Sequence, residues 1–285
     1  MIRIDPELVS AARAGSRSAL EALARALQRP IFNLAIRMLA NSPDAEDATQ
    51  EILVKVITHL GALRDLEGAG AWVFRIACRH LVHVRVQGRV EAQRLTFRAF
   101  AADLDEGLQE LRDDSLRDPE TLAAIEQVKI GCTLAMLICL PRPVRAAYVL
   151  GEIFELSDTE AAFALEIEPA AFRQRLKRAR TLVIGFVQSR CGIASSDAAC
   201  RCDRRVMHAV RLGRVTRDPP AFAADPAAPS VAEVRASIAR LEGARATAAI
   251  MRSNPDFTTE VGRLISSILD ADGRDGTMRP PPSVS

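Results

Sequence analysis

The sequence predicts an all-α protein, in which two small helical domains are joined by a flexible linker and followed by a helical C-terminal extension. Hydrophobic residues make up 48% of the 285 residues, enough for a core in each part, but aromatic residues make up only 4%. Alanine, leucine and arginine are abundant, as is typical of helix-on-helix packing, and no long run alternates β-branched with polar residues. We therefore expect helices and no sheet.

Three helices are expected within the first 40 residues. A first helix starts at Asp5, a second runs from Ser16 to about Gln28, and Pro30 opens a third that ends at Leu39. Proline suits the first position of a helix because the amide that it lacks would have no partner there. This segment supplies apolar faces for a core.

The fourth expected helix, capped by Ser42 and Pro43, carries an acidic face. Its apolar residues recur at helical spacing, and its polar residues fall on the opposite side: Asp44, Asp47, Gln50 and Glu51. Acids near a helix N-terminus also offset the macrodipole whatever the function, so this face alone does not establish a binding surface.

The fifth expected helix follows Gly68–Gly70 and carries the single tryptophan, Trp72. Tryptophan serves in core packing or in stacking on unpaired bases, and the sequence leaves both roles open. Arg75, Arg79 and His83 follow at steps of four residues, which places them on one outward face. We therefore expect a basic surface here.

A helix-turn-helix is expected between residues 140 and 183. Ser157 and Glu160 have the spacing of a capping box, and Pro169 opens the second helix after a three-residue turn. That second helix has an apolar stripe of Phe172, Leu176, Ala179 and Val183. Although the net charge of the chain is only +2, five basic residues and no acid lie between Pro169 and Arg180: Arg173, Arg175, Lys177, Arg178 and Arg180. Such a helix is typical of DNA recognition, the alternative being a solvated basic face.

These segments together resemble a known family. The chain is similar to region 2 of the sigma-70 superfamily, in its extracytoplasmic-function (ECF) group, in the runs D-A-E-D-A-T-Q-E-I from Asp44 and A-W-V-F-R-I-A from Ala71. It is similar to region 4 of the same group in the runs L-P-x-x-x-R-x-A-Y-V-L from Leu140, E-A-A from Glu160 and R-Q-R-L-K-R-A-R from Arg173. The resemblance covers roughly residues 5–185 and places the chain in a longer ECF subgroup with a C-terminal extension.

The resemblance implies a non-enzymatic transcription initiation factor that requires no cofactor. Its partners would be core RNA polymerase, through the β′ clamp and β flap, and promoter DNA. Three sets of residues take implied roles: Asp44, Asp47, Gln50 and Glu51 bind polymerase; Trp72, Arg75, Arg79 and His83 bind the −10 element; Arg173, Gln174, Arg175, Lys177, Arg178 and Arg180 bind the −35 element. An anti-sigma factor, or the protein's own C-terminal extension, would regulate it.

The resemblance also divides the chain. Residues 1–98 would form region 2, residues 99–118 an acidic linker, residues 119–190 region 4 and residues 191–285 the extension. A capping box at Ser230 is expected to start a helix that runs to about Met251, and a last helix is expected after Pro255.

Two departures from the family pattern stand out. Ala69 occupies a position where an aromatic residue is frequent, which predicts an unusual −10 preference. Glu166 occupies the turn position usually held by glycine, which predicts a positive φ angle there, and Glu168 stands where a small polar cap is usual.

The extension contains three cysteines in the spacing Cys-x8-Cys-x-Cys. Cys191, Cys200 and Cys202, with His208 nearby, are candidate zinc ligands. The usual Cys-x2–4-Cys pair is absent, so reduced cysteines packed on an irregular segment remain the alternative.

Two other functions remain open from the residues alone. One is a stand-alone helix-turn-helix regulator, and the other is a thiol or metal redox sensor that acts through the C-terminal cysteines. An enzyme is not expected, because no nucleophile–base pair and no phosphate-binding glycine loop stands out. The N-terminus does not resemble a signal peptide and the longest apolar run, residues 130–140, is too short to span a bilayer, so we expect a cytoplasmic protein without a membrane partner.

Overall fold

The computed structural model describes residues 4–83, 95–109, 118–216, 229–239, 241 and 243–257. Within these ranges the protein is helical, as predicted, and the only pairing of extended backbone is an isolated bridge between Cys191 and Cys200. The expected all-α fold class is confirmed. The helix predicted after Pro255 lies almost entirely outside the described residues.

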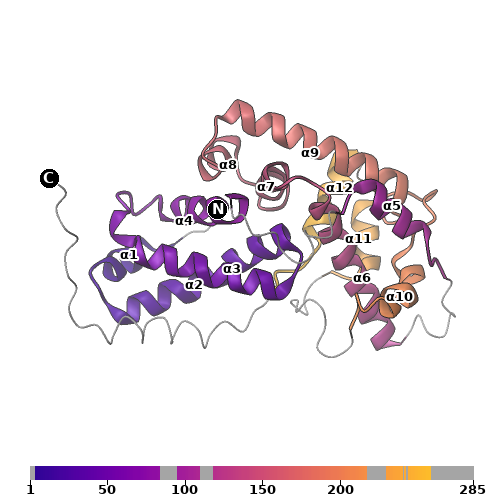
Figure 1. The fold of residues 1–285 in the computed structure, drawn as a ribbon, viewed down its shortest axis with the longest axis horizontal. Coiled ribbons are helices and arrows are strands. Elements are labelled where there is room, and N and C mark those ends of the chain that lie inside the picture. The colour runs from indigo at the N-terminus through magenta and orange to yellow at the C-terminus, as the bar shows by residue number, and fades with distance from the viewer. Residues whose placement is uncertain are drawn as a thin grey trace.

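Residues 6–83 form a bundle of four helices, which we call the first half of the molecule, as distinct from the helices that follow it (Figure 1). These are α1 (Pro6–Arg13), α2 (Arg17–Leu39), α3 (Ser42–Thr58) and α4 (Ala69–His83), with a short 3₁₀ helix at Leu60–Ala62 before α4. Asp5 and Ser16 cap α1 and α2 by accepting hydrogen bonds from amides of the first turn.

Two predictions about this bundle were wrong. Pro30 does not open a new helix but lies inside α2, which continues to Leu39. The missing hydrogen bond is offset by packing, because all ten residues from Ile31 to Ala40 are buried. The cap of α3 is Asn41, whose side chain accepts a hydrogen bond from the Asp44 amide at 3.0 Å, and Ser42 is the first helical residue.

Part of the expected linker is helical. Residues Phe97–Asp105 form α5, which the sequence analysis did not predict and which packs on α6 and α9. The next helix, α6 (Pro119–Ile138), is long and apolar enough to cross a membrane by length and composition, but half of its most apolar window is buried. Because α6 packs on α2, α5, α7, α10 and α11, it is the central helix of the second half.

The helix-turn-helix follows α6. It comprises α7 (Arg142–Tyr148), a π-helical turn (Val149–Ile153), α8 (Asp158–Ala164) and α9 (Pro169–Arg190). The capping box of Ser157 and Glu160 is present at the start of α8, and α9 begins at Pro169, so both sequence signals are confirmed. The predicted apolar stripe of α9 is fully buried.

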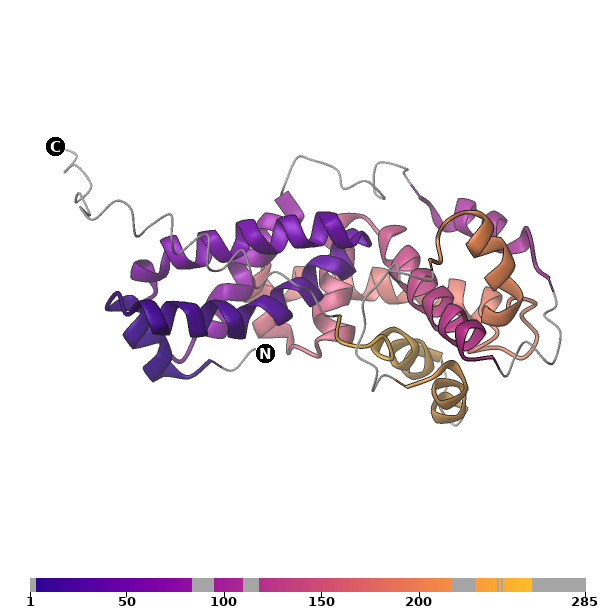
Figure 2. The same cartoon turned by 90° about the horizontal axis from the view of Figure 1, so that it is seen from below.

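The C-terminal extension packs on the helix-turn-helix rather than standing apart. It contains α10 (Cys202–Arg211), α11 (Val231–Ile238) and α12 (Gly243–Arg252). The capping box at Ser230 is confirmed, but the single helix expected to Met251 is in fact two, with the break before Gly243, whose φ is 49°. Seen from below, α11 and α12 lie beneath the second half of the molecule (Figure 2).

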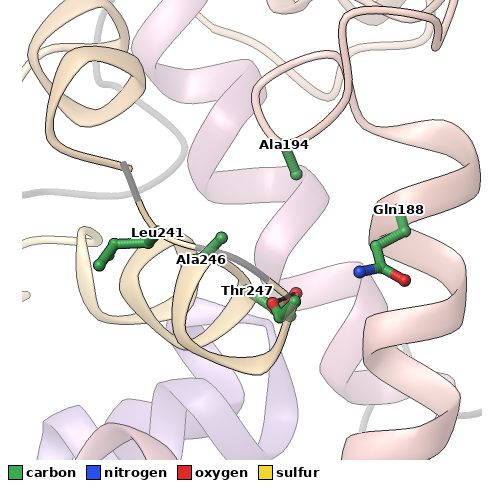
Figure 3. Close-up of a pocket in the computed structure, with 6 residues that line it drawn as sticks. Gln188, Ala194, Leu241, Ala246 and Thr247 are labelled. Carbon is green, nitrogen blue, oxygen red and sulfur yellow. Dashed lines mark hydrogen bonds between the residues drawn. The ribbon is translucent and has the colours of Figure 1, made fainter. Parts of the chain in front are cut away.

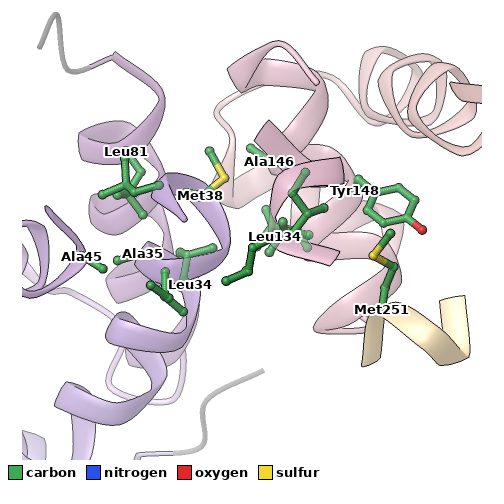
Figure 4. Close-up of a cluster of buried hydrophobic side chains, with 14 of the residues drawn as sticks. Leu34, Ala35, Met38, Ala45, Leu81, Leu134, Ala146, Tyr148 and Met251 are labelled. Carbon is green, nitrogen blue, oxygen red and sulfur yellow. The ribbon is translucent and has the colours of Figure 1, made fainter. Parts of the chain in front are cut away.

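One continuous hydrophobic core joins the three parts. Its buried residues extend from Val9 in α1 to Phe257 at the end of the described extension. Figure 4 shows where the parts meet: Leu34 and Met38 of α2 face Leu134 of α6, and Met251 of the extension lies beside Tyr148. The regions assigned from the sequence therefore pack as one body in this structure.

Candidate nucleic-acid interface

The acidic face of α3 is accessible. Asp47 and Glu51 are exposed, whereas Asp44 and Gln50 are half-buried. At the edge of this face the Glu51 carboxylate lies 3.9 Å from the Lys55 ammonium and 3.9 Å from Nε2 of His80. Burial of the His80 ring, together with the neighbouring Lys55, lowers the pKa of His80. His80 is therefore neutral at pH 7 and ties α3 to α4, with its Nδ1 2.7 Å from the Lys55 ammonium.

The basic face of α4 looks toward the helix-turn-helix. Arg79 is exposed, Arg75 is half-buried, and the side chain of His83 lies outside the described residues. The Arg75 guanidinium lies over the ring of Phe163 in α8, 5.0 Å from its centroid. Phe74 makes a second contact, an edge-on packing against Phe154 with ring centroids 5.6 Å apart. The two candidate DNA-binding parts therefore touch.

Two cavities lie along this contact. One of about 580 Å³ is lined by Arg64, Trp72 and Arg75 from the first bundle and by Thr159, Glu160 and Phe163 from α8. A second of about 540 Å³ is lined by the basic side chains Lys55, Arg75 and Arg79 and by Glu166 from the turn. Trp72 is 9% exposed and lines both cavities. It thus packs in the core and also borders both cavities.

The turn of the helix-turn-helix has the conformation predicted from its sequence. Glu166 has a φ of 53°, as expected at a position where glycine is usual. Glu168 is the N-cap of α9, and no side-chain hydrogen bond caps the helix there. Both are carboxylates at the N-terminal end of the recognition helix, where DNA phosphates would approach.

The basic residues of α9 differ in their exposure and in their ion pairs within the protein. Arg173, Gln174, Lys177, Arg178 and Arg180 are exposed, and Arg175 is half-buried. Nε of Arg180 donates to Glu152 at 2.6 Å, and Arg173 lies 3.4 Å from Asp158. In the described part of the chain, Lys177 and Arg178 have no ion pair. They are the cations best placed to meet a phosphate.

The cysteines gather around one small cavity. Four thiols line a space of about 30 Å³: Cys132 of α6, Cys191, Cys200 and Cys202. Cys132 was missed because it is 59 residues from Cys191 in the chain, and only the packing of α6 on α10 brings the two together. Burial raises the pKa of all four thiols. Among the described residues, no three His, Cys, Asp or Glu side chains are grouped so as to hold a metal ion.

His208 does not join the thiols. Its Nε2 lies 4.0 Å from Asp103 of α5, and Asp103 in turn accepts hydrogen bonds from Arg205 at 2.9 Å and Arg214 at 2.8 Å. The ligand set expected from the sequence is therefore not assembled. Instead, this cluster holds the acidic segment after region 2 against the extension.

A further cavity lies between α9 and the extension (Figure 3). It is lined by Gln188 of α9, Ala194, Leu241 and the α12 residues Gly243, Ala246 and Thr247. The lining side chains are uncharged, so this cavity presents no candidate catalytic or metal-binding group. It does show that α12 borders the end of the recognition helix.

An accessible acidic helix, a basic helix and a helix-turn-helix in one chain are features expected of an all-α DNA-binding protein. Comparison with known proteins agrees: residues 23–89 match the family described as Sigma-70 region 2. The RNA polymerase sigma-H factor of Pseudomonas aeruginosa is 28% identical over 181 residues, which cover 63% of this chain and 91% of that protein. The ECF RNA polymerase sigma factor SigE of Mycolicibacterium smegmatis is 31% identical over 152 residues, which cover 53% of this chain and 54% of that protein. The chain is therefore similar to RNA polymerase sigma factors, and residues 23–89 match region 2 of the sigma-70 family.

Proposed function

We propose that this protein acts in the cytoplasm as an ECF-type sigma factor, which binds core RNA polymerase and directs it to promoters. One observation carries the proposal: a single chain joins an accessible acidic face on α3 to a basic recognition helix, α9. In this account Asp44, Asp47, Gln50 and Glu51 contact polymerase. The face of α4 that carries Trp72, Arg75, Arg79 and His83 binds the −10 element, and the basic residues of α9 bind the −35 element.

The mechanism is binding and strand opening rather than covalent catalysis. Cationic side chains of α9 position the protein by contacts to phosphates, and its polar side chains read base edges in the major groove. In this mechanism Trp72 stacks on an unpaired base, which is supported by its position in the lining of two cavities beside the basic face of α4. Docking to polymerase raises the effective concentration of both surfaces at one promoter, so each needs only modest affinity alone.

Charge reversal on α3 tests the proposal against a stand-alone regulator. We expect the double variant Asp47→Lys/Glu51→Lys to lose binding to core polymerase, because both side chains are exposed on the docking face. The control Glu7→Lys/Asp197→Lys makes the same change in net charge at exposed sites elsewhere and should bind polymerase normally. Co-elution with core polymerase on size exclusion measures the result. Normal binding by the α3 variant would favour a regulator that acts without polymerase.

A metal or redox response is a second proposal, supported by the four thiols around one cavity. We infer that Cys132 replaces His208 in the ligand set suggested by the sequence. Binding would require the protonated thiols to lose their protons and turn toward a common point, so affinity would rise with pH. Metal analysis of protein purified without added metal or chelator tests this. A zinc content near one per chain that is lost in Cys132→Ser supports it, and a content near zero removes it.

A further inference from the structure

The two promoter-binding surfaces cannot both be used in the arrangement seen here. The −10 and −35 elements are centred about 25 base pairs apart, roughly 85 Å along B-form DNA at 3.4 Å per base pair. In the structure, by contrast, α4 and α8 are in direct contact, with the Arg75 guanidinium 5.0 Å from the ring centroid of Phe163. Glu166 borders the same cavity as Arg75 and Arg79, where an anionic phosphate would otherwise lie. The structure is therefore a closed form.

A short segment of the extension contacts both the bundle of α1–α4, the first half of the molecule, and the helices that follow it, the second half. We name residues 253–257, which follow α12, the strap. Two of its contacts reach α6: the backbone carbonyl of Ser253 accepts from Lys129 at 3.4 Å, and the Asn254 amide donates to the Thr133 hydroxyl at 2.6 Å. The strap is thereby attached to the second half of the molecule.

The other end of the strap is attached to α2 of the first half. The side-chain amide of Asn33 makes two hydrogen bonds to the backbone of Phe257, donating to its carbonyl at 3.0 Å and accepting from its amide at 2.9 Å. Asn33 is 2% exposed and Phe257 is 1% exposed, so both groups are removed from water. These paired hydrogen bonds favour the seated strap, because a displaced strap leaves the Asn33 amide without a partner until water reaches it.

Arg37 links the strap to both halves at once. Its guanidinium bonds to Oδ1 of Asn33 at 2.7 Å and to the Pro255 carbonyl at 3.4 Å. It also lies over two aromatic rings, 5.0 Å from the centroid of Phe257 and 5.8 Å from that of Phe154 in the segment before α8. At the surface, Asp256 of the strap pairs with Arg29 of α2 at 3.2 Å.

We propose that the strap is an intramolecular latch, which holds the sigma factor closed by seating Phe257 against Asn33 and Arg37 of α2 while Asn254 is bound to α6. The inference rests on the proposed function, because only a factor that must span two promoter elements is inhibited by such closure. Opening separates α4 from α8 and frees Arg75 and Glu166 from one another. Because only open molecules can use both promoter-binding surfaces, the apparent affinity for the promoter equals the intrinsic affinity multiplied by the open fraction.

Reversing the charge of Asp256 tests the latch at a site that is not part of the core. Its side chain is 60% exposed, and a lysine there would lie near the guanidinium groups of Arg29 and Arg37. We expect Asp256→Lys in the full-length protein to increase the radius of gyration in small-angle X-ray scattering. In the presence of core polymerase it should also tighten binding to promoter DNA about tenfold, as when an open fraction of about one tenth becomes dominant. Arg29→Glu added to Asp256→Lys should move both values back toward those of the wild type.

A matched pair of core substitutions separates latching from general stability. Phe257→Ala removes the buried ring of the strap, and Phe100→Ala removes a buried ring of α5 that stacks on Phe186 with centroids 5.2 Å apart, away from α2. Only Phe257→Ala should open the molecule. If Phe100→Ala opens it equally, or if Asp256→Lys changes neither the radius of gyration nor the affinity, the latch is wrong. Scattering does not depend on polymerase, so opening without any binding to core polymerase would support the latch and contradict the proposed function instead.

Discussion

Glu166 holds the turn of the helix-turn-helix at a φ of 53°, a conformation that costs an L-residue about 1 kcal/mol relative to glycine. The same acidic residue lines the cavity that Arg75 and Arg79 also line. The sequence predicted the positive φ, because glycine is usual at that position. It did not predict that the acid would face the basic side of α4, which depends on how the two halves pack.

Replacing Glu166 with glycine should therefore have two effects. We expect Glu166→Gly to raise the free energy of unfolding by about 0.5–1 kcal/mol through relief of strain, and to tighten promoter binding because one negative charge is removed near the phosphates. Urea denaturation and fluorescence anisotropy measure the two effects. Glu168→Gly removes the same charge where φ is −69° and no strain exists, so it should change binding without a comparable gain in stability.

The buried thiols give the stability a pH dependence. Burial raises the pKa of Cys78 to about 12, well above the value of an exposed thiol. Because the folded state holds this proton more tightly than the unfolded state, the stabilisation is complete below the unfolded pKa, near 9, and is lost as the pH rises toward 12. Under reducing conditions the free energy of unfolding should fall from pH 9 to 11. The slope should be smaller in Cys78→Ala by about 1.4 kcal/mol per pH unit, and an unchanged slope would contradict the assignment.

Pro30 marks a limit of residue-level rules. The proline predicts a helix start, and the structure instead continues α2 through it. The rule considers only the hydrogen bond that the helix loses at Pro30. In the folded protein, the burial of residues 31–40 offsets that loss. The residues that bury this part of α2 belong to α3, α6 and the strap, which are distant in sequence. The sequence around residue 30 therefore does not predict the burial.

At the scale of elements, α9 combines two roles on one helix. Its apolar stripe and its basic residues were both predicted, since both follow from a period of 3.6 residues. The sequence did not predict which of the basic side chains form ion pairs within the protein. The partner of Arg180 is Glu152, in a π-helical turn 28 residues earlier in the chain. The sequence likewise did not predict that Cys132 and Cys191 line the same cavity, because they are 59 residues apart in the chain.

Arg178 and Arg180 should respond differently to truncation. We expect Arg178→Ala to weaken DNA binding at all sequences and to reduce the slope of log affinity against log salt by about one, as for loss of one phosphate contact. Arg180→Ala should instead lower stability, because Glu152 is 8% exposed and would lose its ion pair. Titrations of promoter DNA at several salt concentrations, together with thermal melts, separate the two. Equal salt slopes in the two variants would refute this division.

At the scale of the whole molecule, the all-α class and the helix-turn-helix followed from the sequence, whereas the packing of the helices did not. Periodicity places apolar faces on each helix but does not say which faces meet. The contacts that close the protein are distant in sequence: Arg145 of α7 donates to the carbonyl of Met38 in α2, and Asn33 binds Phe257. If the protein acts as the proposed sigma factor, this closed body is one of two states, and the proposed latch sets the balance between them.

Transcription from a promoter of the protein's own genome tests the central claim most directly. Purified protein is mixed with its cognate core RNA polymerase and genomic DNA fragments, and transcript 5′ ends are mapped. We predict discrete start sites that appear only when the protein is present and that disappear with Asp47→Lys/Glu51→Lys. Core polymerase that gives the same starts with and without the protein, although the protein binds DNA, would contradict its assignment as a sigma factor.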